Sequence, residues 1–356
     1  MPVTLDLPHS LAGHCGSGAL RDLCAFYGLS WSDEPISEDV AFGLGGSLAF
    51  TYLEIPELAP AAPPIYLVGR SGDLEVDFCK NVGVELDLRE TDDPDEAWQW
   101  VKSELDSGRP TMVWADIAEL DYLRVKMSNT HHDIVLCGYD ENEGVVLVAD
   151  NDREEIQRCS GGSLARARMS SGFPSPNRNA TFLMRWPNKL RDPREAIRAA
   201  VDGSIVTMRT ASQSVFGGEV TSGLASVDHF VAQYPHWPDL FGEGLPAALS
   251  GLRVFIAKAG TGGAMFRGLQ AGFLEEAGQL LGDELLLDAG GLYRRLEAEW
   301  LGLADSFASS EVRSQPVAAH ARGLAHVERI GVLEHEGIRL LERWSAGPPA
   351  DVRART

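Results

Sequence analysis

The sequence is poor in cysteine, and no two cysteines have the short spacing that is typical of metal-binding or redox motifs. Five occur in 356 residues, and no CxxC pair is present. The count is odd, and a chain of this length can bury a sizeable core without disulfide bonds. We therefore expect a reducing, cytoplasmic setting and no zinc site, and nothing in the sequence implies another metal.

Long apolar runs are also missing. The longest candidate, residues 41–53, is only about 13 residues long and contains three glycines, so it is too short to cross a bilayer. The first ten residues, MPVTLDLPHS, have neither the basic nor the apolar region of a signal peptide. We therefore expect no membrane span and no signal peptide.

Positive charge is scarce. Lys and Arg total 31 and Asp and Glu total 52, which gives a formal net charge of −21. Such a surface repels phosphate backbones and anionic membranes, so neither nucleic acid nor a membrane is expected as a partner. Cationic substrates such as polyamines or amino sugars remain compatible. Hydrophobic residues make up 44% of the chain, which excludes global disorder.

The pattern of apolar residues changes along the chain. The first half alternates a helix at 15–27 and another at 94–108 with strands near 110–115, 134–137, 145–149 and 181–185. After residue 192 helical patterns dominate and strand patterns nearly vanish. The sequence therefore predicts an α+β protein with a first domain at 1–195, a mainly helical domain at 196–345 and a flexible tail at 346–356. Homo-oligomerisation remains open.

Three residues of the first half form a chemically plausible set. Cys15 begins an amphipathic helix, where the helix dipole favours a thiolate. His132 precedes one strand, and Asp150 follows the next one along the chain. A hairpin of these strands would place His132 beside Asp150, which could hold the imidazole while it accepts the thiol proton. The alternative is a structural cysteine, a surface histidine and a turn-forming aspartate.

This order resembles papain-like cysteine peptidases, particularly the bacterial peptidases that trim double-glycine leaders. It is more closely similar to the butirosin biosynthesis protein H family of acyltransferases. The motifs that carry the likeness in the first half are His14-Cys15, Tyr27-Gly28, Ser37-Glu38, Phe42-Gly43-Leu44-Gly45, residues 108–116, Leu120-Asp121-Tyr122 and residues 132–140. Those in the second half are residues 234–237, 240–242, 260–267 and 273–277. Asp121 departs from the proline that the family pattern has there.

The resemblance implies a papain-like first domain and a reaction. An acyl or aminoacyl group would pass from an acyl-carrier-protein thioester, on its phosphopantetheine arm, to Cys15 and then to an amine such as an aminoglycoside. His132 would act as the base and Asp150 would orient it, with no cofactor of the protein's own. The oxyanion donors would be the backbone N–H of Cys15 and, at the position of a papain-like glutamine, His9. A hydrolase that uses water, or a non-catalytic binding module, remains open.

Four further features have both a functional and a structural interpretation. Glu38 and Asp116 are candidates for binding a cationic acceptor, although Glu38 could equally form a capping box with Ser37. Arg267, beside the glycines at 260–263, is a candidate for binding the pantetheine phosphate, although this turn could simply pack a helix. Residues 153–198 carry ten basic and four acidic residues, so they could dock an acidic carrier protein or be solvated. His131 adjoins His132, and the strand phase favours His132 as the inward residue.

Overall fold

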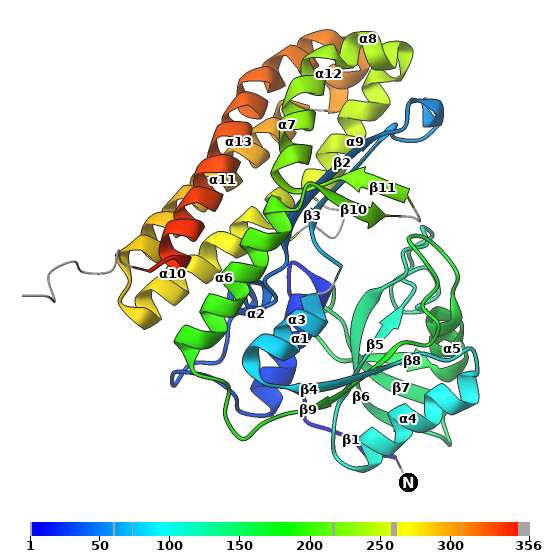
Figure 1. Ribbon diagram of the computed structural model, residues 1–356. Helices are drawn as coiled ribbons and strands as arrows, with labels where there is room; N and C mark the ends of the chain where they lie inside the picture. The colour runs from blue at the N-terminus through cyan, green and yellow to red at the C-terminus, as the bar shows by residue number, and fades with distance from the viewer. Residues whose placement is uncertain are drawn as a thin grey trace, which may run out of the picture. The chain divides into compact units, whose positions relative to one another are not determined.

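The computed structural model describes residues 2–59, 61–72, 74–215, 218–257, 262–307 and 309–347. It confirms an α+β protein with a sheet-containing N-terminal part and a helical C-terminal part (Figure 1). The chain forms two compact units. Unit 1 comprises Met1–Ala41 and Phe78–Asp192, and unit 2 comprises Phe42–Asp77 and Pro193–Thr356.

Unit 1 is built on one antiparallel sheet. Its path runs β4-β9-β5-β6-β7-β8, and β1 pairs with β6. The strands are β1 (Val3–Thr4), β4 (Glu85–Arg89), β5 (Thr111–Ala115), β6 (His132–Asp140), β7 (Val145–Ala149), β8 (Gln157–Ser160) and β9 (Thr181–Arg185). The helices are α1 (Cys15–Phe26), α4 (Pro94–Asp106) and α5 (Gly161–Met169). The strands and helices predicted in this half are confirmed, whereas β1, β4, β8 and α5 were not predicted.

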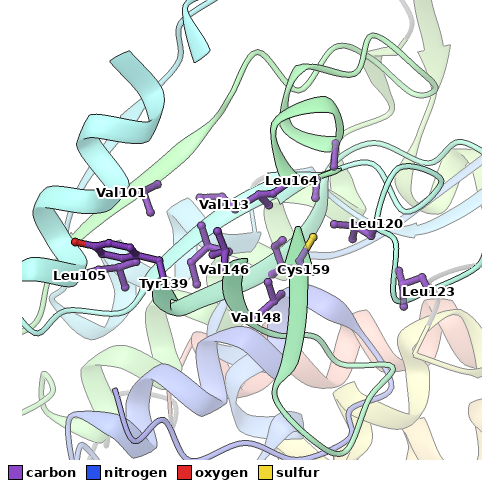
Figure 2. Close-up of a cluster of buried hydrophobic side chains, with 14 residues drawn as sticks. Val101, Leu105, Val113, Leu120, Leu123, Tyr139, Val146, Val148, Cys159 and Leu164 are labelled. Carbon is purple, nitrogen blue, oxygen red and sulfur yellow. The ribbon is translucent and has the colours of Figure 1, made fainter. Parts of the chain in front are cut away.

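The core of unit 1 explains why the middle of β6, residues 134–137, is apolar. Ile134 and Leu136 of β6 lie in one buried cluster with residues of α4, α5 and the neighbouring strands (Figure 2). Helix α1 also contacts β6. Burying a side chain such as Ile134 contributes about 1.5–3 kcal/mol, so this core fixes the strand that carries His132.

Unit 2 contains the helices of the second half. They are α6 (Pro193–Arg209), α7 (Gly223–Gln233), α8 (Trp237–Phe241), α9 (Leu245–Ala257), α10 (Arg267–Leu281), α11 (Glu284–Asp305), α12 (Ser309–Ser314) and α13 (Pro316–Ser345). Helix α11 packs along both α10 and α13, and the three lie side by side in Figure 1. A short hairpin joins β10 (Ser212–Val215) to β11 (Gly218–Thr221). The helical pattern predicted after residue 192 is thus confirmed. Of the tail at 346–356, residues 348–356 lie outside the described residues.

Residues 42–77, which the sequence assigned to the first domain, belong to unit 2. They form the antiparallel hairpin of β2 (Leu48–Glu54) and β3 (Ile65–Arg70). The rings of Phe50 and Tyr52 on β2 pack against Phe230, and Phe50 also packs against Trp300. These aromatic contacts draw the hairpin into unit 2. The chain therefore passes from one unit to the other within α2 (Glu38–Leu44) and again within α3 (Leu74–Val82).

One stretch of the described residues, Gly223–Ala257, is long and apolar enough to pass for a membrane-spanning helix by length and composition. It is not a regular helix, because short 3-10 turns at Tyr234–His236 and Gly242–Gly244 interrupt it. In its most apolar window, 44% of the residues are buried in the protein. Core helices of proteins without membrane spans pass the same test, so the stretch is weak evidence for a span.

Candidate active site

Cys15 is the first residue of α1, as the sequence predicted. Its neighbour His14 has extended backbone angles and caps the helix, because the backbone N–H of Ser17 donates to its Nδ1 at 3.3 Å. The helix dipole therefore begins at the cysteine, which favours a negative charge on its sulfur. Gly18 of α1 faces the preceding loop. A Cβ atom at this position would lie only 2.5 Å from the Cβ of Ala12, so the absence of a side chain lets the first turn of α1 pack closely against that loop.

His132 and Asp150 lie side by side at the open end of the β6–β7 hairpin, as predicted. The His132 Nε2 is 3.0 Å from the Asp150 Oδ2, and both side chains are buried. The Tyr122 hydroxyl donates to the same oxygen at 2.8 Å, and the Asp152 backbone N–H donates to Oδ1 at 3.1 Å. Asp150 is thus held as a carboxylate, and its pKa is lowered: burial would raise it, but His132 and these hydrogen bonds outweigh burial.

Cys15 completes the arrangement, because its thiol and the imidazole of His132 lie close enough to shift each other's pKa. Since Nε2 of His132 contacts Asp150, Nδ1 is the ring nitrogen that remains available to the sulfur. Burial by itself would raise the pKa of the thiol, but the charges and hydrogen bonds of His14 and His132 hold it well below its usual range. Burial would likewise lower the pKa of His132, but Asp150 and Cys15 raise it well above its ordinary value. Both shifts favour the thiolate–imidazolium form of the pair.

The other cysteines have the opposite character. Cys24, Cys79, Cys137 and Cys159 are all buried. Burial raises the pKa of Cys137 to about 12 and that of Cys159 to about 11. It also raises the pKa of Cys24. Such thiols are poor nucleophiles, so the site chemistry concentrates at Cys15.

A further carboxyl group lies at the sulfur. The thiol of Cys15 donates a hydrogen bond to Oδ2 of Asp133 at 3.6 Å, and Asp133 is only 2% exposed. Asp133 pairs with Trp114 across β5 and β6, and Trp114 stacks on His131 with ring centroids 3.9 Å apart. His131 thus contacts an aromatic ring, and His132 is the histidine that meets Asp150, as the strand phase predicted.

Glu38 lies next to the loop that leads to Cys15, and its hydrogen bonds are structural. Its carboxylate accepts the backbone N–H of Gly13 at 2.9 Å and that of His14 at 2.8 Å. It also accepts the hydroxyl of Ser17 at 3.1 Å. These bonds fix the loop that leads into α1. Ser17 and Gly13 therefore compete with any acceptor amine for this carboxylate, and the geometry favours positioning over substrate binding.

The structure gives Asp116 no role in binding a substrate. Its Oδ1 accepts the backbone N–H groups of Ala118 and Asn129, both at 3.0 Å. Its Oδ2 accepts the hydroxyls of Ser128 and Ser170, both at 2.6 Å. Burial would raise the pKa of this carboxyl, but the four hydrogen bonds lower it. The side chain is saturated and 2% exposed, so it ties loops together instead of lining a cleft.

His9 is also engaged elsewhere. Its Nδ1 bonds with Asp22 at 2.5 Å, and its Nε2 bonds with the Arg153 carbonyl at 2.9 Å. With both ring nitrogens occupied, His9 has no N–H to offer an oxyanion. The expectation for His9 is therefore corrected. For the other expected donor, the first turn of a helix leaves N–H groups such as that of Cys15 directed outward.

Arg267 lies in the core of unit 2 and is 0% exposed. Its Nε donates to Glu334 at 2.8 Å, and its Nη1 donates to the carbonyls of Gly69 and Met265 at 2.9 and 2.7 Å. A residue so enclosed cannot receive a pantetheine phosphate, so this expectation is corrected. Of the Gly-Thr-Gly-Gly segment at 260–263, residues 260 and 261 lie outside the described residues.

Many basic side chains of the segment at 153–198 are buried or paired with acidic residues in the structure. Within unit 1, Arg168 is buried against the Asn179 carbonyl and the Thr181 hydroxyl. Four other arginines of this segment form ion pairs with acidic residues: Arg158 with Glu143, Arg166 with Glu119, Arg178 with Glu90 and Asp92, and Arg185 with Glu104. These contacts favour internal pairing over an open docking surface.

Sequence reasoning passed over three residues of the site. His14 and Asp133 directly adjoin the predicted Cys15 and His132, and Tyr122 stands in a motif to which no role was attached. Adjacency could have flagged the first two. For Tyr122 no local signal was available, because its contact with Asp150 spans 28 residues.

Within the described residues, no group of three or more His, Cys, Asp or Glu side chains could hold a metal ion. The fold and the site define an α+β protein in which a thiol lies close to an imidazole that is hydrogen-bonded to a carboxylate. Residues 14–151 match the family model of butirosin biosynthesis protein H, N-terminal, and residues 162–341 match a domain of unknown function (DUF4872). The chain belongs to the butirosin biosynthesis protein H family. No curated protein matches it.

Proposed function

We propose that the protein is a cysteine-dependent acyltransferase of specialised-metabolite biosynthesis, as the antibiotic named in its family suggests. It takes an acyl or aminoacyl group from an acyl-carrier-protein thioester and delivers it to an amine, which is aminoglycoside-like or of another kind. Cys15 is the nucleophile, His132 the base and Asp150 the orienting acid. We also propose a papain-like architecture for the first domain and a cytoplasmic location.

The observation that carries the proposal is the arrangement of three side chains in which Cys15 lies close to His132 and His132 is hydrogen-bonded to Asp150. The lowered pKa of the Cys15 thiol favours its thiolate form, whereas Cys24, Cys137 and Cys159 have raised pKa values. A thiolate exchanges readily with a thioester, because one thioester bond replaces another.

In the first half-reaction the Cys15 thiolate attacks the thioester carbonyl. The backbone N–H of Cys15 stabilises the developing oxyanion at the start of α1. The bond from the acyl carbon to the pantetheine sulfur breaks, and the imidazolium of His132 gives its proton to that leaving sulfur. The products are acyl-Cys15, a free pantetheine thiol and neutral His132.

In the second half-reaction an amine attacks the acyl carbon, and the bond from that carbon to Sγ of Cys15 breaks. His132 takes a proton from the amine, and Asp150 stabilises the imidazolium that forms. The thiolate and the imidazolium of the resting site are thereby restored.

The test separates acylation from transfer. Incubation with an aminoacyl-carrier protein or an aminoacyl thioester, followed by intact mass and peptide mapping, should place the acyl group on Cys15. Addition of an aminoglycoside should then release it as an amide. An adduct on Cys24, Cys79, Cys137 or Cys159 with Cys15 unmodified would overturn the assignment. Release as the free acid at the same rate with or without amine would identify a hydrolase instead.

A further inference from the structure

The sulfur of Cys15 also contacts the carboxyl group of Asp133, which is not part of the triad. Asp133 Oδ2 lies 3.6 Å from Sγ, and its residue is 2% exposed. The thiol of Cys15 donates a hydrogen bond to this oxygen, which favours the protonated thiol, and a carboxylate here also opposes the thiolate form because like charges disfavour one another. Asp133 is therefore badly placed to activate the sulfur. Once Cys15 is acylated, however, the sulfur carries no charge and this repulsion disappears.

The position of Asp133 suits the second substrate. An ammonium group that is hydrogen-bonded to Oδ2 would lie close to an acyl carbon attached to Sγ, because that carbon is one covalent bond from the sulfur. Trp114 is the cross-strand partner of Asp133, so the two side chains leave the same face of the sheet. Its ring is fixed by stacking on His131. A carboxylate is a favourable partner for an ammonium ion, since the hydrogen bond between them is charge-assisted.

The proton balance of the reaction points to the same residue. An acceptor that arrives as an ammonium ion must lose two protons to become an amide. In the acyl-enzyme, His132 is neutral and can hold only one of them, which restores the imidazolium of the resting site. The second proton needs another acceptor beside the reacting nitrogen.

We propose that Asp133 binds the ammonium group of the acceptor and takes the second proton, which it then passes to solvent. The inference rests on the proposed function and names the substrate class of its second half-reaction: a primary amine that is protonated in solution. Glu38 and Asp116, which the sequence suggested for this task, are occupied by hydrogen bonds from their own loops.

The experiment compares Asp133→Asn with wild type in the two half-reactions. The donor is a small aminoacyl thioester, so that carrier docking does not contribute. Acylation of Cys15 should stay within about twofold of wild type or become faster, because the opposing charge is gone. KM for an aminoglycoside should rise about tenfold or more, as expected for the loss of a charge-assisted hydrogen bond. Asp133→Glu should recover part of the loss, and Glu85→Gln, an exposed carboxylate on β4, serves as the matched control.

A second acceptor distinguishes ammonium binding from damage to the site. Hydroxylamine is largely uncharged near neutral pH, so its attack on acyl-Cys15 should be nearly the same in wild type and Asp133→Asn. The role of Asp133 is overturned if Asp133→Asn acylates normally and keeps its KM for the aminoglycoside, or if both acceptors lose equally. Failure of the wild type to acylate at Cys15 would instead overturn the proposed function itself, and this inference with it.

Discussion

The carboxylate of Glu38 accepts the backbone N–H of His14 at 2.8 Å, one residue before the nucleophile. The same carboxylate accepts the N–H of Gly13 and the hydroxyl of Ser17. A single side chain of α2 therefore sets the path of the loop that presents Cys15 at the start of α1. This relation makes Glu38 a positioning residue, which acts through the loop and does not touch the reacting atoms.

Replacement of Glu38 by alanine should therefore slow the reaction without removing the triad. The backbone N–H groups of Gly13 and His14 lose their acceptor, so the loop gains freedom and Cys15 is less well aligned. We expect alkylation of Cys15 by iodoacetamide and acyl transfer to fall together, by about tenfold. Asp33→Ala, an exposed acidic residue nearby in sequence, is the control. Unchanged alkylation in Glu38→Ala would contradict the positioning role.

Substitutions in the triad should have unequal effects. Cys15→Ser and His132→Ala should abolish transfer, because the nucleophile or its base is gone. Asp150→Asn should leave weak activity, since Asp150 orients the imidazole and stabilises its charge but does not attack. Single-turnover acylation measures all three. Wild-type rates in Asp150→Asn would show that another residue holds the ring.

The hydroxyl of Tyr122 offers a finer test, because it shares Oδ2 of Asp150 with His132. Tyr122→Phe removes one donor to the carboxylate but preserves the ring that packs against the core. We expect a loss of about 3- to 20-fold in acylation, well below that of His132→Ala. Thermal denaturation of the variant provides the control for folding. A loss as large as that of Asp150→Asn would mean that the tyrosine, and not the carboxylate, governs the ring.

The reactivity of Cys15 should depend on pH in a way set by its two histidines. The pKa of Cys15 is lowered and that of His132 is raised, so the ion pair exists between these two values. Alkylation should stay fast well below about pH 8.5, where an ordinary thiol is protonated, and should fall only as the pH drops through the lowered pKa of Cys15. His132→Ala should move this acid limb toward higher pH. A wild-type limb near the value of a free thiol would contradict the ion pair.

The same shifts predict how stability changes with pH. His132 has a raised pKa when folded, so its contribution is fully present below about pH 6.5 and is lost as the pH rises through that raised value. Asp150 has a lowered pKa, so its contribution is present above about pH 3.9 and is lost as the pH falls through the lowered value. Urea unfolding of wild type and His132→Ala across this range should show the first effect as a loss of their difference at alkaline pH. A constant difference would contradict it.

The buried pair of Arg267 and Glu334 should stabilise unit 2 without taking part in the chemistry. Both side chains are 0% exposed. Glu334→Gln leaves the arginine charge buried without its counter-ion, which typically costs about 3–5 kcal/mol in unfolding free energy. Glu328→Gln, an exposed position on the same helix, should change stability by less than about 0.5 kcal/mol. Equal midpoints of chemical unfolding in the two variants would contradict this prediction.

Local patterns in the sequence predicted much of unit 1 and the triad. The turn between β6 and β7, with Gly144 at a positive φ of 65°, is marked by its polar residues and glycine, and it brings Asp150 back to His132. The destinations of Asp116 and Arg267 could not be predicted. Their partners, such as Ser170 and Glu334, lie 54 and 67 residues away, and no local pattern encodes such distances. Their charges alone suggested substrate binding, whereas in the folded protein Asp116 and Arg267 form hydrogen bonds that stabilise the structure.

The course of Phe42–Asp77 has a consequence for how this gene can be divided. The hairpin of β2 and β3 lies in the N-terminal half of the sequence, but it packs with the helices of unit 2. A cut near residue 195 would therefore separate Phe50 and Tyr52 from the aromatic rings of Phe230 and Trp300 against which they pack. The N-terminal fragment would then expose an apolar two-stranded hairpin, which is marginal in water and prone to association. Neither half of the open reading frame is self-sufficient, so recombination between relatives should exchange the two halves together or carry the hairpin along with the helices.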